Sequence, residues 1–401
     1  MKSVNDYRGI VNDHIISKIY KLASSLYGKS VAHVNSTYYG GGVAEILSSL
    51  IPLMNDVGLD AGWRIIRGTN DLFSITKKFH NALQGDSINL SEIKKKLYIQ
   101  ANEDFSTYTH LDHDLVIVHD PQPLPLIKFY KKKQPWIWRC HIDLSHPHAG
   151  LWDYMKGFIL KYDSVIVSHE SYKNDLPMQH KIINPAIDPL THKNKPVKDK
   201  TIQKIIKKFH IPIDKPLITQ ISRFDKWKDP LGVINVFKRV KKKVDCRLIL
   251  CGNMASDDPE GLKIYEKVKR KANDLIEKGD LILLTFESNI LVNVLQKISA
   301  VIIQKSIREG FGLTVTEALW KETPVVASKV GGIPLQIEHG VNGYLFDPCD
   351  YDAFANQIIE LIKNKELAKT IGKEGKELVR EKFLITRILT DYLELMNEHL
   401  T

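Results

Sequence analysis

Two basic side chains follow a predicted strand at a spacing that suits phosphate binding. Strand-helix alternation predicts a strand of a parallel sheet at Leu217–Ile221, and Arg223 and Lys228 come after it. Asp229 and Pro230 then predict the N-cap and the first residue of a helix. Arginine offers a planar fork for phosphate and lysine a compact charge, so together they can neutralise a diphosphate. The alternative is that both are solvated surface cations.

Two glutamates flank a glycine-containing turn. Glu309 and Glu317 are eight positions apart, and the glycines between them predict a loop that enters a helix near Leu313. Glu309 would then lie in the loop and Glu317 one turn inside the helix. The backbone amides of Gly312, Leu313 and Thr314 would point at an anion. Since carboxylates repel an anion, these two suit sugar hydroxyls instead. The alternative is that Glu317 is a charge on the helix surface.

A glycine run forms a second candidate loop. Gly40, Gly41 and Gly42 follow a predicted strand, Ser30–Val34, and precede a helix that begins near Val43. Glycines let the backbone approach a ligand, and the helix N-terminus offers free N–H groups. The loop suits a phosphate or a sugar hydroxyl, although it fits neither the dinucleotide fingerprint nor the Walker pattern. An ordinary tight turn is the alternative.

Histidines and aspartates follow two further predicted strands. His119 and Asp120 come after one apolar run, and His141 and Asp143 come after the next. These groups can hold an acceptor hydroxyl and stabilise a developing charge. For any single histidine, a hydrogen-bonded structural role is the alternative. The histidines of this region match no clear zinc-ligand spacing, and no metal site is predicted.

Strand-helix alternation predicts the elements that position these loops. It favours an α/β fold of two Rossmann-like doubly wound parallel-sheet domains facing across a cleft, with ligands at the carboxyl ends of the strands. A proline-containing stretch, 184–189, predicts the hinge. We expect an N-terminal domain, 1–188, and a C-terminal domain, 189–384. The predicted strands are Ser30–Val34, Trp63–Ile66, Leu115–Val118, Trp136–Trp138, Ser164–Val167, Leu217–Ile221, Arg247–Cys251, Leu281–Leu284, Ala300–Ile303 and Val325–Ala327.

Composition narrows the class of protein. The 401 residues are 43% hydrophobic and 26% charged, as in folded globular proteins. No apolar run approaches the roughly 18 residues of a membrane span, and the charged N-terminus does not resemble a secretory signal. Four cysteines without a C-x-x-C pair predict neither a disulfide framework nor a zinc ribbon, and favour a reducing cytoplasm. The net charge of +10 suits an anionic substrate, a nucleic acid or a membrane surface.

Taken together, these features resemble the retaining glycosyltransferases of the GT-B architecture, family 4. The resemblance covers nearly the whole chain. It rests on the glycine loop, the Arg223 and Lys228 pair, the Glu309-to-Glu317 spacing and the later turn at residues 331–334. Three stretches, 119–123, 138–145 and 184–189, more narrowly resemble the trehalose synthase and trehalose phosphorylase branch. The compact length resembles the synthases, because the fungal-type phosphorylases are longer.

The resemblance implies a reaction. Nucleotide-diphosphoglucose, with ADP or UDP as the nucleotide, and glucose would give α,α-trehalose and nucleoside diphosphate, reversibly and with retained anomeric configuration. It also implies a final helix, 385–401, that packs back on the first domain, a cytoplasmic homodimer and no tightly bound cofactor. The nucleobase preference and any assistance by Mg²⁺ stay open. The resemblance implies a front-face displacement without an enzyme carboxylate nucleophile, in which the leaving phosphate takes the acceptor's proton. The first domain, 1–188, would bind the acceptor, and the second, 189–384, would bind the nucleotide-sugar donor.

The resemblance also implies residue roles. Arg223 and Lys228 would bind the donor diphosphate with Gly41, Gly42 and the amides of residues 312–314. Glu317 would hold the ribose hydroxyls and Glu309 the glucosyl hydroxyls. His141 would lie beside the glucosyl C6 hydroxyl or the acceptor.

The implied catalytic set is His141, Arg223, Lys228 and Glu309. The implied acceptor set is Asp120, His141 and Asp143. No metal ligand is implied.

Four rival functions remain. A trehalose phosphorylase would use the same cations for inorganic phosphate, and a transferase to a membrane lipid would use the basic charge. A two-lobed, non-catalytic sugar-binding protein would need no phosphate clamp. A nucleic-acid binder would need a basic stripe with interleaved aromatic side chains, and the sequence does not indicate such a stripe. We therefore expect sugars and nucleotide-sugars as partners, with neither nucleic acid nor membrane.

Overall fold

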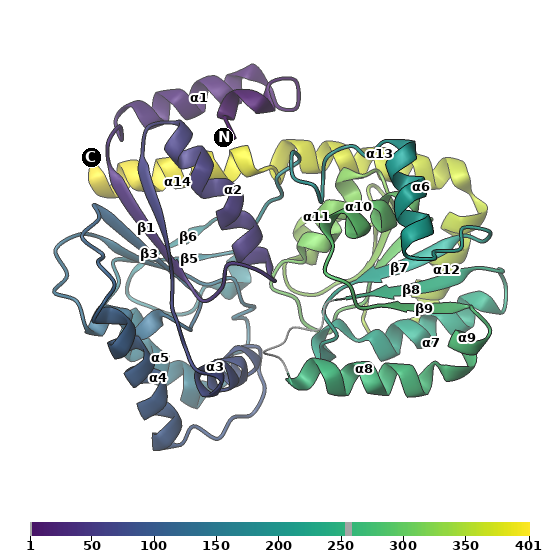
Figure 1. Ribbon diagram of the computed structural model, residues 1–401, viewed down its shortest axis with the longest axis horizontal. Coiled ribbons are helices and arrows are strands. Elements are labelled where there is room, and N and C mark those ends of the chain that lie inside the picture. The colour runs from purple at the N-terminus through teal and green to yellow at the C-terminus, as the bar shows by residue number, and fades with distance from the viewer. Residues whose placement is uncertain (1, 253–258) are drawn as a thin grey trace. The chain divides into compact units, whose positions relative to one another are not determined.

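The chain forms two compact units, each built around its own parallel sheet (Figure 1). The structure, a computed structural model, describes residues 2–252 and 259–401. The first unit contains residues 2–186 together with Leu384–Thr401, and the second contains Ile187–Phe383. The chain thus leaves the first unit once and returns to it through its last helix.

The sheet of the first unit has the order β2-β1-β3-β4-β5-β6, and all neighbouring strands are parallel. The order reverses between β1 and β3, and in sheets of this kind ligands bind at such a switch point, at the carboxyl ends of the strands. The strands are β1 (Ser30–Asn35), β2 (Asp60–Ile65), β3 (Leu115–His119), β4 (Trp136–Arg139), β5 (Ser164–Val167) and β6 (Gln179–Ile182).

The helices of the first unit cover this sheet. The final helix, α14, contacts α1 and α2, and Figure 1 shows it in yellow beside them. The helices are α1 (Asp13–Ser24), α2 (Gly42–Asp56), α3 (Asn70–Leu83), α4 (Glu92–Ser106), α5 (Ala149–Ile159) and α14 (Ile385–Leu400).

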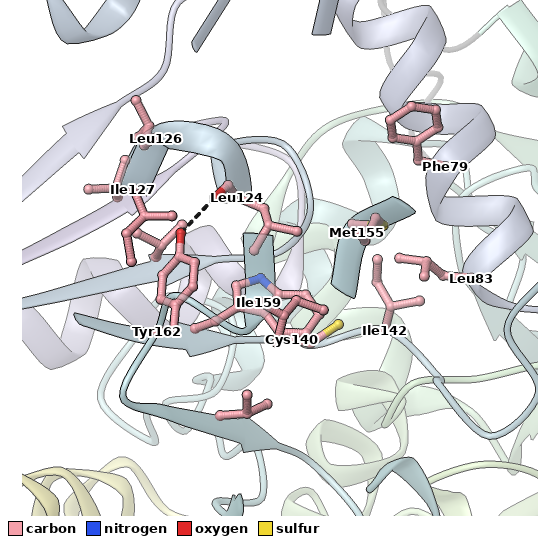
Figure 2. Close-up of a cluster of buried hydrophobic side chains, with 14 of the residues drawn as sticks. Phe79, Leu83, Leu124, Leu126, Ile127, Cys140, Ile142, Met155, Ile159 and Tyr162 are labelled. Atoms are coloured by element: carbon pink, nitrogen blue, oxygen red, sulfur yellow. Dashed lines mark hydrogen bonds between the residues drawn. The ribbon is translucent and has the colours of Figure 1, made fainter. Parts of the chain in front are cut away.

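The core of the first unit is rich in large aromatic and branched side chains. Trp136 and Trp138, on β4, are fully buried. Figure 2 shows part of this cluster, in which the buried Tyr162 hydroxyl donates a hydrogen bond to the carbonyl of Leu124 at 2.7 Å. Because its polar atom is satisfied, the tyrosine ring can stay in the apolar interior without an unpaired hydroxyl.

The sheet of the second unit has the order β12-β11-β10-β7-β8-β9, again with parallel neighbours. Its order reverses between β7 and β10. The strands are β7 (Leu217–Ile221), β8 (Arg247–Cys251), β9 (Leu281–Leu284), β10 (Val301–Gln304), β11 (Val325–Ser328) and β12 (Tyr344–Phe346). The helices are α6 (Asp199–Lys208), α7 (Pro230–Lys241), α8 (Pro259–Lys271), α9 (Asn273–Glu277), α10 (Asn289–Ile298), α11 (Leu313–Trp320), α12 (Tyr351–Lys363) and α13 (Lys365–Lys382).

Both faces of the second sheet are covered, as its continuous apolar strands predict. Along β8, Leu248 and Leu250 belong to one buried cluster, whereas Ile249 and Cys251 belong to another. Successive side chains of a strand point to opposite faces, so the two clusters lie on the two sides of the sheet. The expectation of doubly wound α/β sheets is confirmed. Among the described residues, no helix is both long enough and apolar enough to span a bilayer.

Candidate active site

The second unit places its two predicted charged loops next to each other. The loop after β7 carries Lys228, and the loop after the neighbouring strand β10 carries Glu309. The N–H of Ile307 donates to the carbonyl of Trp227 at 2.7 Å and joins the two loops. These loops lie at the topological switch point, where ligands bind in sheets of this kind.

Lys228 and Glu309 form a close ion pair. The Nζ atom of Lys228 lies 2.5 Å from Oε2 of Glu309, and the glutamate residue is 7% exposed. The same oxygen accepts hydrogen bonds from Gln304, at 3.1 Å, and from Ser306, at 3.0 Å. Three donors therefore fix one carboxylate oxygen, and the carboxylate in turn fixes the lysine head at the edge of the sheet.

Arg223 lies on the same loop but is more open to solvent. Its side chain is 43% exposed, and its Nη2 atom lies 3.9 Å from a carboxylate oxygen of Asp225. Asp225 is buried, and its Oδ1 atom accepts from the N–H of Trp227 at 2.9 Å. The guanidinium thus has freedom to reach an anion, whereas the loop beneath it is held by the aspartate.

A buried cation supports the residue that follows Lys228. Asp229 adopts a left-handed conformation, with φ of 44°, and its Oδ1 atom caps α7 by accepting from the N–H of Gly232 at 2.9 Å. Its other oxygen accepts from Lys305, which is almost fully buried and lies 4.6 Å from the ring centroid of Tyr351. The predicted helix start at Asp229 and Pro230 is confirmed.

The turn before α11 also has the predicted form. Gly312 has φ of 85°, a conformation that favours glycine, and it precedes the first residue of the helix, Leu313. Gly332 packs so closely on this turn that a Cβ atom would lie 2.7 Å from the carbonyl oxygen of Gly310. The first amides of the helix have no carbonyl partner within it, and so can bind an anion.

Glu317 lies one turn inside α11, as predicted, but not on the helix surface. It is fully buried, and its Oε1 atom lies 2.8 Å from Nζ of Lys193. Its Oε2 atom accepts from Gln296 at 3.0 Å. The alternative of a surface charge is therefore wrong, and a ribose hydroxyl would have to replace Lys193 or Gln296 to reach the carboxylate.

A second lysine is buried beside Glu317. Lys321 donates to the main-chain oxygen of Glu317 and to Oδ1 of Asn194, each at 3.1 Å. Burial lowers the pKa of Lys321 to about 7. The negative charge of Glu317 acts to raise this pKa, and the positive charges of Lys193 and Lys297 act to lower it. This cluster is therefore close to a change of charge at neutral pH.

In the first unit the glycine loop lies at the switch point after β1. Gly40 has φ of 77°, and α2 begins at Gly42. A Cβ atom added at Gly40 or Gly41 would meet nothing within 4 Å, so the loop borders open space. Tyr38 packs on Trp63, with ring centroids 4.4 Å apart, and leaves half of its own surface exposed.

Three histidines of the first unit form a chain of contacts. Nδ1 of His33 lies 3.0 Å from Nε2 of His119, and Nδ1 of His119 lies 3.0 Å from Nε2 of His141. Burial lowers the pKa of His33 to about 3 and the pKa of His119 and His141 well below the usual value. Sequence reasoning missed His33, for which the signal was a lone histidine within an apolar strand.

The two predicted acceptor-site aspartates have different surroundings. Asp120 has φ of 63°, and its carboxylate accepts from the N–H of His141 at 2.8 Å. Burial raises the pKa of Asp120 to about 6, while the His141 amide and Arg139 act in the opposite direction. Asp143 is buried and accepts from the N–H of Ser145 at 2.9 Å and from its hydroxyl at 2.6 Å. Asp120 is thus the more open of the two.

The structure separates the candidates by unit. Arg223, Lys228, Glu309, Glu317 and the residues 312–314 belong to the second unit, whereas the glycine loop and the histidine chain belong to the first. Lys193, Gln304 and Lys305 were not predicted as site residues. Lys193 and Lys305 pair with residues that are far away in the sequence, and Gln304 is the last residue of an ordinary strand. Within the described part of the chain, no group of three or more histidine, cysteine, aspartate or glutamate side chains is arranged to hold a metal ion.

Comparisons with known proteins agree with this architecture. The family model "Trehalose synthase, N-terminal domain" matches residues 33–174, and the model "Glycosyl transferases group 1" matches residues 201–378. A trehalose synthase of Thermococcus litoralis is 47% identical over 401 residues, covering 99% of this chain and 97% of that protein. A trehalose phosphorylase of Grifola frondosa is 29% identical, covering 94% of this chain but 58% of that protein.

The solved structures extend the likeness to the fold. An α,α-trehalose-phosphate synthase (UDP-forming) from Burkholderia xenovorans superposes with a TM-score of 0.76 at 12% identity, covering 93% of this chain and all of that one. Full-length identity of 47% and the two family models establish the relationship. The chain therefore belongs to family 4 of the GT-B glycosyltransferases, as a hexosyltransferase of the branch that contains the trehalose synthases and trehalose phosphorylases.

Proposed function

We propose that the protein transfers glucose from a nucleoside-diphosphate glucose to glucose, forming α,α-trehalose reversibly and with retained anomeric configuration. Full-length similarity to relatives named trehalose synthase supports the product. The observation that carries the donor assignment is the Lys228–Glu309 ion pair with Arg223 on the same loop. A lysine held in place by Glu309 and a more open arginine, both at the edge of a sheet, suit a diphosphate leaving group.

Each charged group then has a defined task. Lys228 and Arg223 stabilise the negative charge that develops on the leaving phosphate, aided by the amides at the start of α11. Glu309 orients Lys228 and can accept hydrogen bonds from the glucosyl hydroxyls. The glycosyl bond to the leaving oxygen breaks, the acceptor oxygen bonds to the anomeric carbon, and the leaving phosphate takes the acceptor's proton.

The first unit supplies the groups for the acceptor in this proposal. His141 and Asp120 are partly open, and both can hydrogen-bond to sugar hydroxyls. Asp143 is committed to Ser145 in this structure and would act by holding the loop. Gly41 and Gly42 would let the donor approach the backbone at the start of α2.

We also propose a cytoplasmic homodimer without a tightly bound cofactor. All four cysteines are free, which suits a reducing compartment. The dimer rests on family resemblance, and size-exclusion chromatography with light scattering tests it. Dependence of the rate on Mg²⁺ is tested by assay with and without EDTA.

Product analysis tests the proposal. Purified protein is incubated with ADP-glucose, UDP-glucose or GDP-glucose together with glucose, and sugars are separated by anion-exchange chromatography. We expect trehalose with at least one donor, and proton NMR should show the α,α linkage. Free glucose without a disaccharide, or no conversion of any donor, would contradict the proposal.

The phosphorylase alternative has a direct test. Trehalose is incubated separately with inorganic phosphate and with ADP or UDP. The synthase assignment predicts nucleotide-glucose from the nucleotides and no glucose 1-phosphate from phosphate. Glucose 1-phosphate formed only with phosphate would instead favour the phosphorylase, to which the chain has 29% identity. Sugar binding that is insensitive to Arg223→Ala, without nucleotide binding, would favour a non-catalytic sugar-binding protein.

A further inference from the structure

Three histidine rings cross the carboxyl edge of the first sheet in one line. His33 lies within β1, His119 ends β3, and His141 follows β4. The His33 and His119 rings are stacked with centroids 5.3 Å apart, and the His119 and His141 rings with centroids 5.4 Å apart. Each pair also shares a nitrogen-nitrogen contact of 3.0 Å. His33 and His119 therefore connect the interior of the sheet with His141, which is predicted to bind the acceptor.

Burial favours the neutral form of all three rings. Burial lowers the pKa of each histidine, and the fully buried guanidinium of Arg139 further disfavours a proton on His119 and His141. Asp120 contacts the backbone of His141, and the buried Tyr392 of α14 packs edge-on against His33. A neutral imidazole has one N–H and one lone pair. Consequently the contacts can be satisfied in only two ways, with every proton on Nδ1 or every proton on Nε2.

The two ends of the chain distinguish these arrangements. Nε2 of His33 is buried and has no hydrogen-bond partner. At the other end, His141 is partly exposed and uses Nε2 toward His119, which leaves its Nδ1 atom for a ligand. If the protons were on Nε2, His33 would bury an unpaired N–H. Orphaned buried N–H groups are rare, whereas an unpaired acceptor is better tolerated.

We propose that His33 and His119 are positioning residues that act through His141. Their hydrogen bonds run from His33 Nδ1–H to His119 Nε2, and from His119 Nδ1–H to His141 Nε2. This direction fixes the ring of His141 as the tautomer that carries its proton on Nδ1. His141 thus presents a neutral N–H that donates a hydrogen bond to a sugar oxygen. In this tautomer its Nδ1 atom acts neither as a base nor as a positive charge. Only the identity of the ligand as a sugar rests on the proposed function.

The tautomer is measured without substrate. The protein is labelled with ¹⁵N-histidine, and a two-bond proton-nitrogen correlation spectrum at pH 7.5 reports which nitrogen of each ring carries the proton. His141→Gln identifies the His141 signals among the 15 histidines. We expect His33, His119 and His141 all to be protonated on Nδ1. Protonation of His141 on Nε2 would overturn the proposal.

A matched pair of variants then tests the action of His33 at a distance. His33→Asn places an amide N–H near the position of Nδ1 and keeps a donor to His119. His33→Phe keeps a ring against Tyr392 but removes the donor. For His33→Phe we expect His141 to populate both tautomers and kcat/KM to fall about fivefold, the effect of one lost orienting hydrogen bond. His33→Asn should keep the wild-type tautomer and stay within about twofold in kcat/KM.

Three results of this pair would count against the proposal. They are an unchanged His141 tautomer in His33→Phe, an equal kinetic loss in both variants, or a mixed tautomer in His33→Asn. If His33→Phe does not fold, as judged by circular dichroism, the wild-type spectrum and His33→Asn still decide. Failure of the proposed function is separate, because wild-type protein that makes no trehalose can still show the predicted tautomers.

Discussion

The candidate sites of the two units are built from different chemistry on the same kind of scaffold. In the second unit, the switch point of the sheet carries an ion pair, Lys228 with Glu309, beside the exposed cation Arg223. In the first unit, the corresponding position carries neutral imidazoles in series. Under the proposed function, the ion pair lies where the phosphate leaves, and the neutral imidazoles lie where a sugar hydroxyl binds. Fold alone determines where each site lies, and side-chain chemistry determines what it binds.

The largest expected effect comes from breaking the charged site. We predict that Lys228→Ala or Glu309→Gln lowers turnover by at least about 10²-fold, as at comparable electrostatic sites. The two losses should not add, because each residue holds the other at 2.5 Å. Steady-state assay of both single variants and the double variant measures this.

A surface lysine provides the control for this experiment. Lys238 is also on the second unit but forms an exposed, 3.7 Å pair with Asp274. Lys238→Ala should retain wild-type turnover. Folded Lys228→Ala or Glu309→Gln protein with near-normal rates would remove those residues from the catalytic set and weaken the contrast between the units.

The next effect is on stability and concerns the support of the charged site. Lys305 is buried against Asp229, so Lys305→Met would leave that carboxylate without its cation. Removal of one partner from a buried pair costs about 3–5 kcal/mol, and partial exposure of Asp229 reduces our expectation to about 2–3 kcal/mol. Urea denaturation measures the change. Lys238→Met, which breaks an exposed pair, should cost less than about 1 kcal/mol, and equal losses would contradict the argument.

The elements of both sheets were largely predictable from the sequence. Short segments rich in apolar residues predicted β5, β7, β8 and β9 with their observed bounds. Two strands, β6 and β12, were not predicted. The first is an edge strand of sequence Gln-His-Lys-Ile without a buried apolar run, and the second is a three-residue edge strand. Both strands bury little side-chain surface, so the apolar pattern that would predict them is weak.

The partners of the candidate residues were much less predictable. Spacing placed Glu317 one turn inside its helix, but its burial depends on Lys193, which lies far earlier in the chain. His33 likewise becomes part of a site only because β1 and β3 are neighbours in the sheet. Local sequence patterns predict the helix, strand or loop on which a side chain lies. Contacts between segments far apart in the sequence determine which residues that side chain contacts.

A third prediction concerns the pH dependence of stability in the buried lysine cluster. The pKa of Lys321 is about 7 in the folded protein and about 10.4 in an unfolded chain, so between these values the unfolded state binds more protons. Stability should therefore rise from pH 7 to pH 9, by up to about 1.4 kcal/mol per pH unit. Below pH 7 both states are protonated and the contribution is constant.

Denaturation of Lys321→Met at the same pH values isolates this contribution. The variant has no titrating amine at this position, so the difference in unfolding free energy between wild type and variant should change with pH above 7. Lys238→Met, at an exposed site, should keep the wild-type slope. Parallel curves for wild type and Lys321→Met would show that the buried amine does not titrate in this range.

The smallest expected effect tests the first unit at Asp120. Asp120→Asn keeps an acceptor for the His141 amide, which lies 2.8 Å away, but removes the charge. Ionisation of one partner strengthens a hydrogen bond by about 1.4 kcal/mol. At pH 8, the KM of Asp120→Asn for the acceptor sugar should therefore be about tenfold higher than that of the wild type, with little change in kcat. Because the pKa of Asp120 is about 6, the wild-type carboxyl is protonated at pH 5, and there the two proteins should have similar KM values. An equal ratio of KM values at pH 5 and pH 8 would mean that the charge of Asp120 does not contact the acceptor, and would leave the first unit with a wholly neutral site.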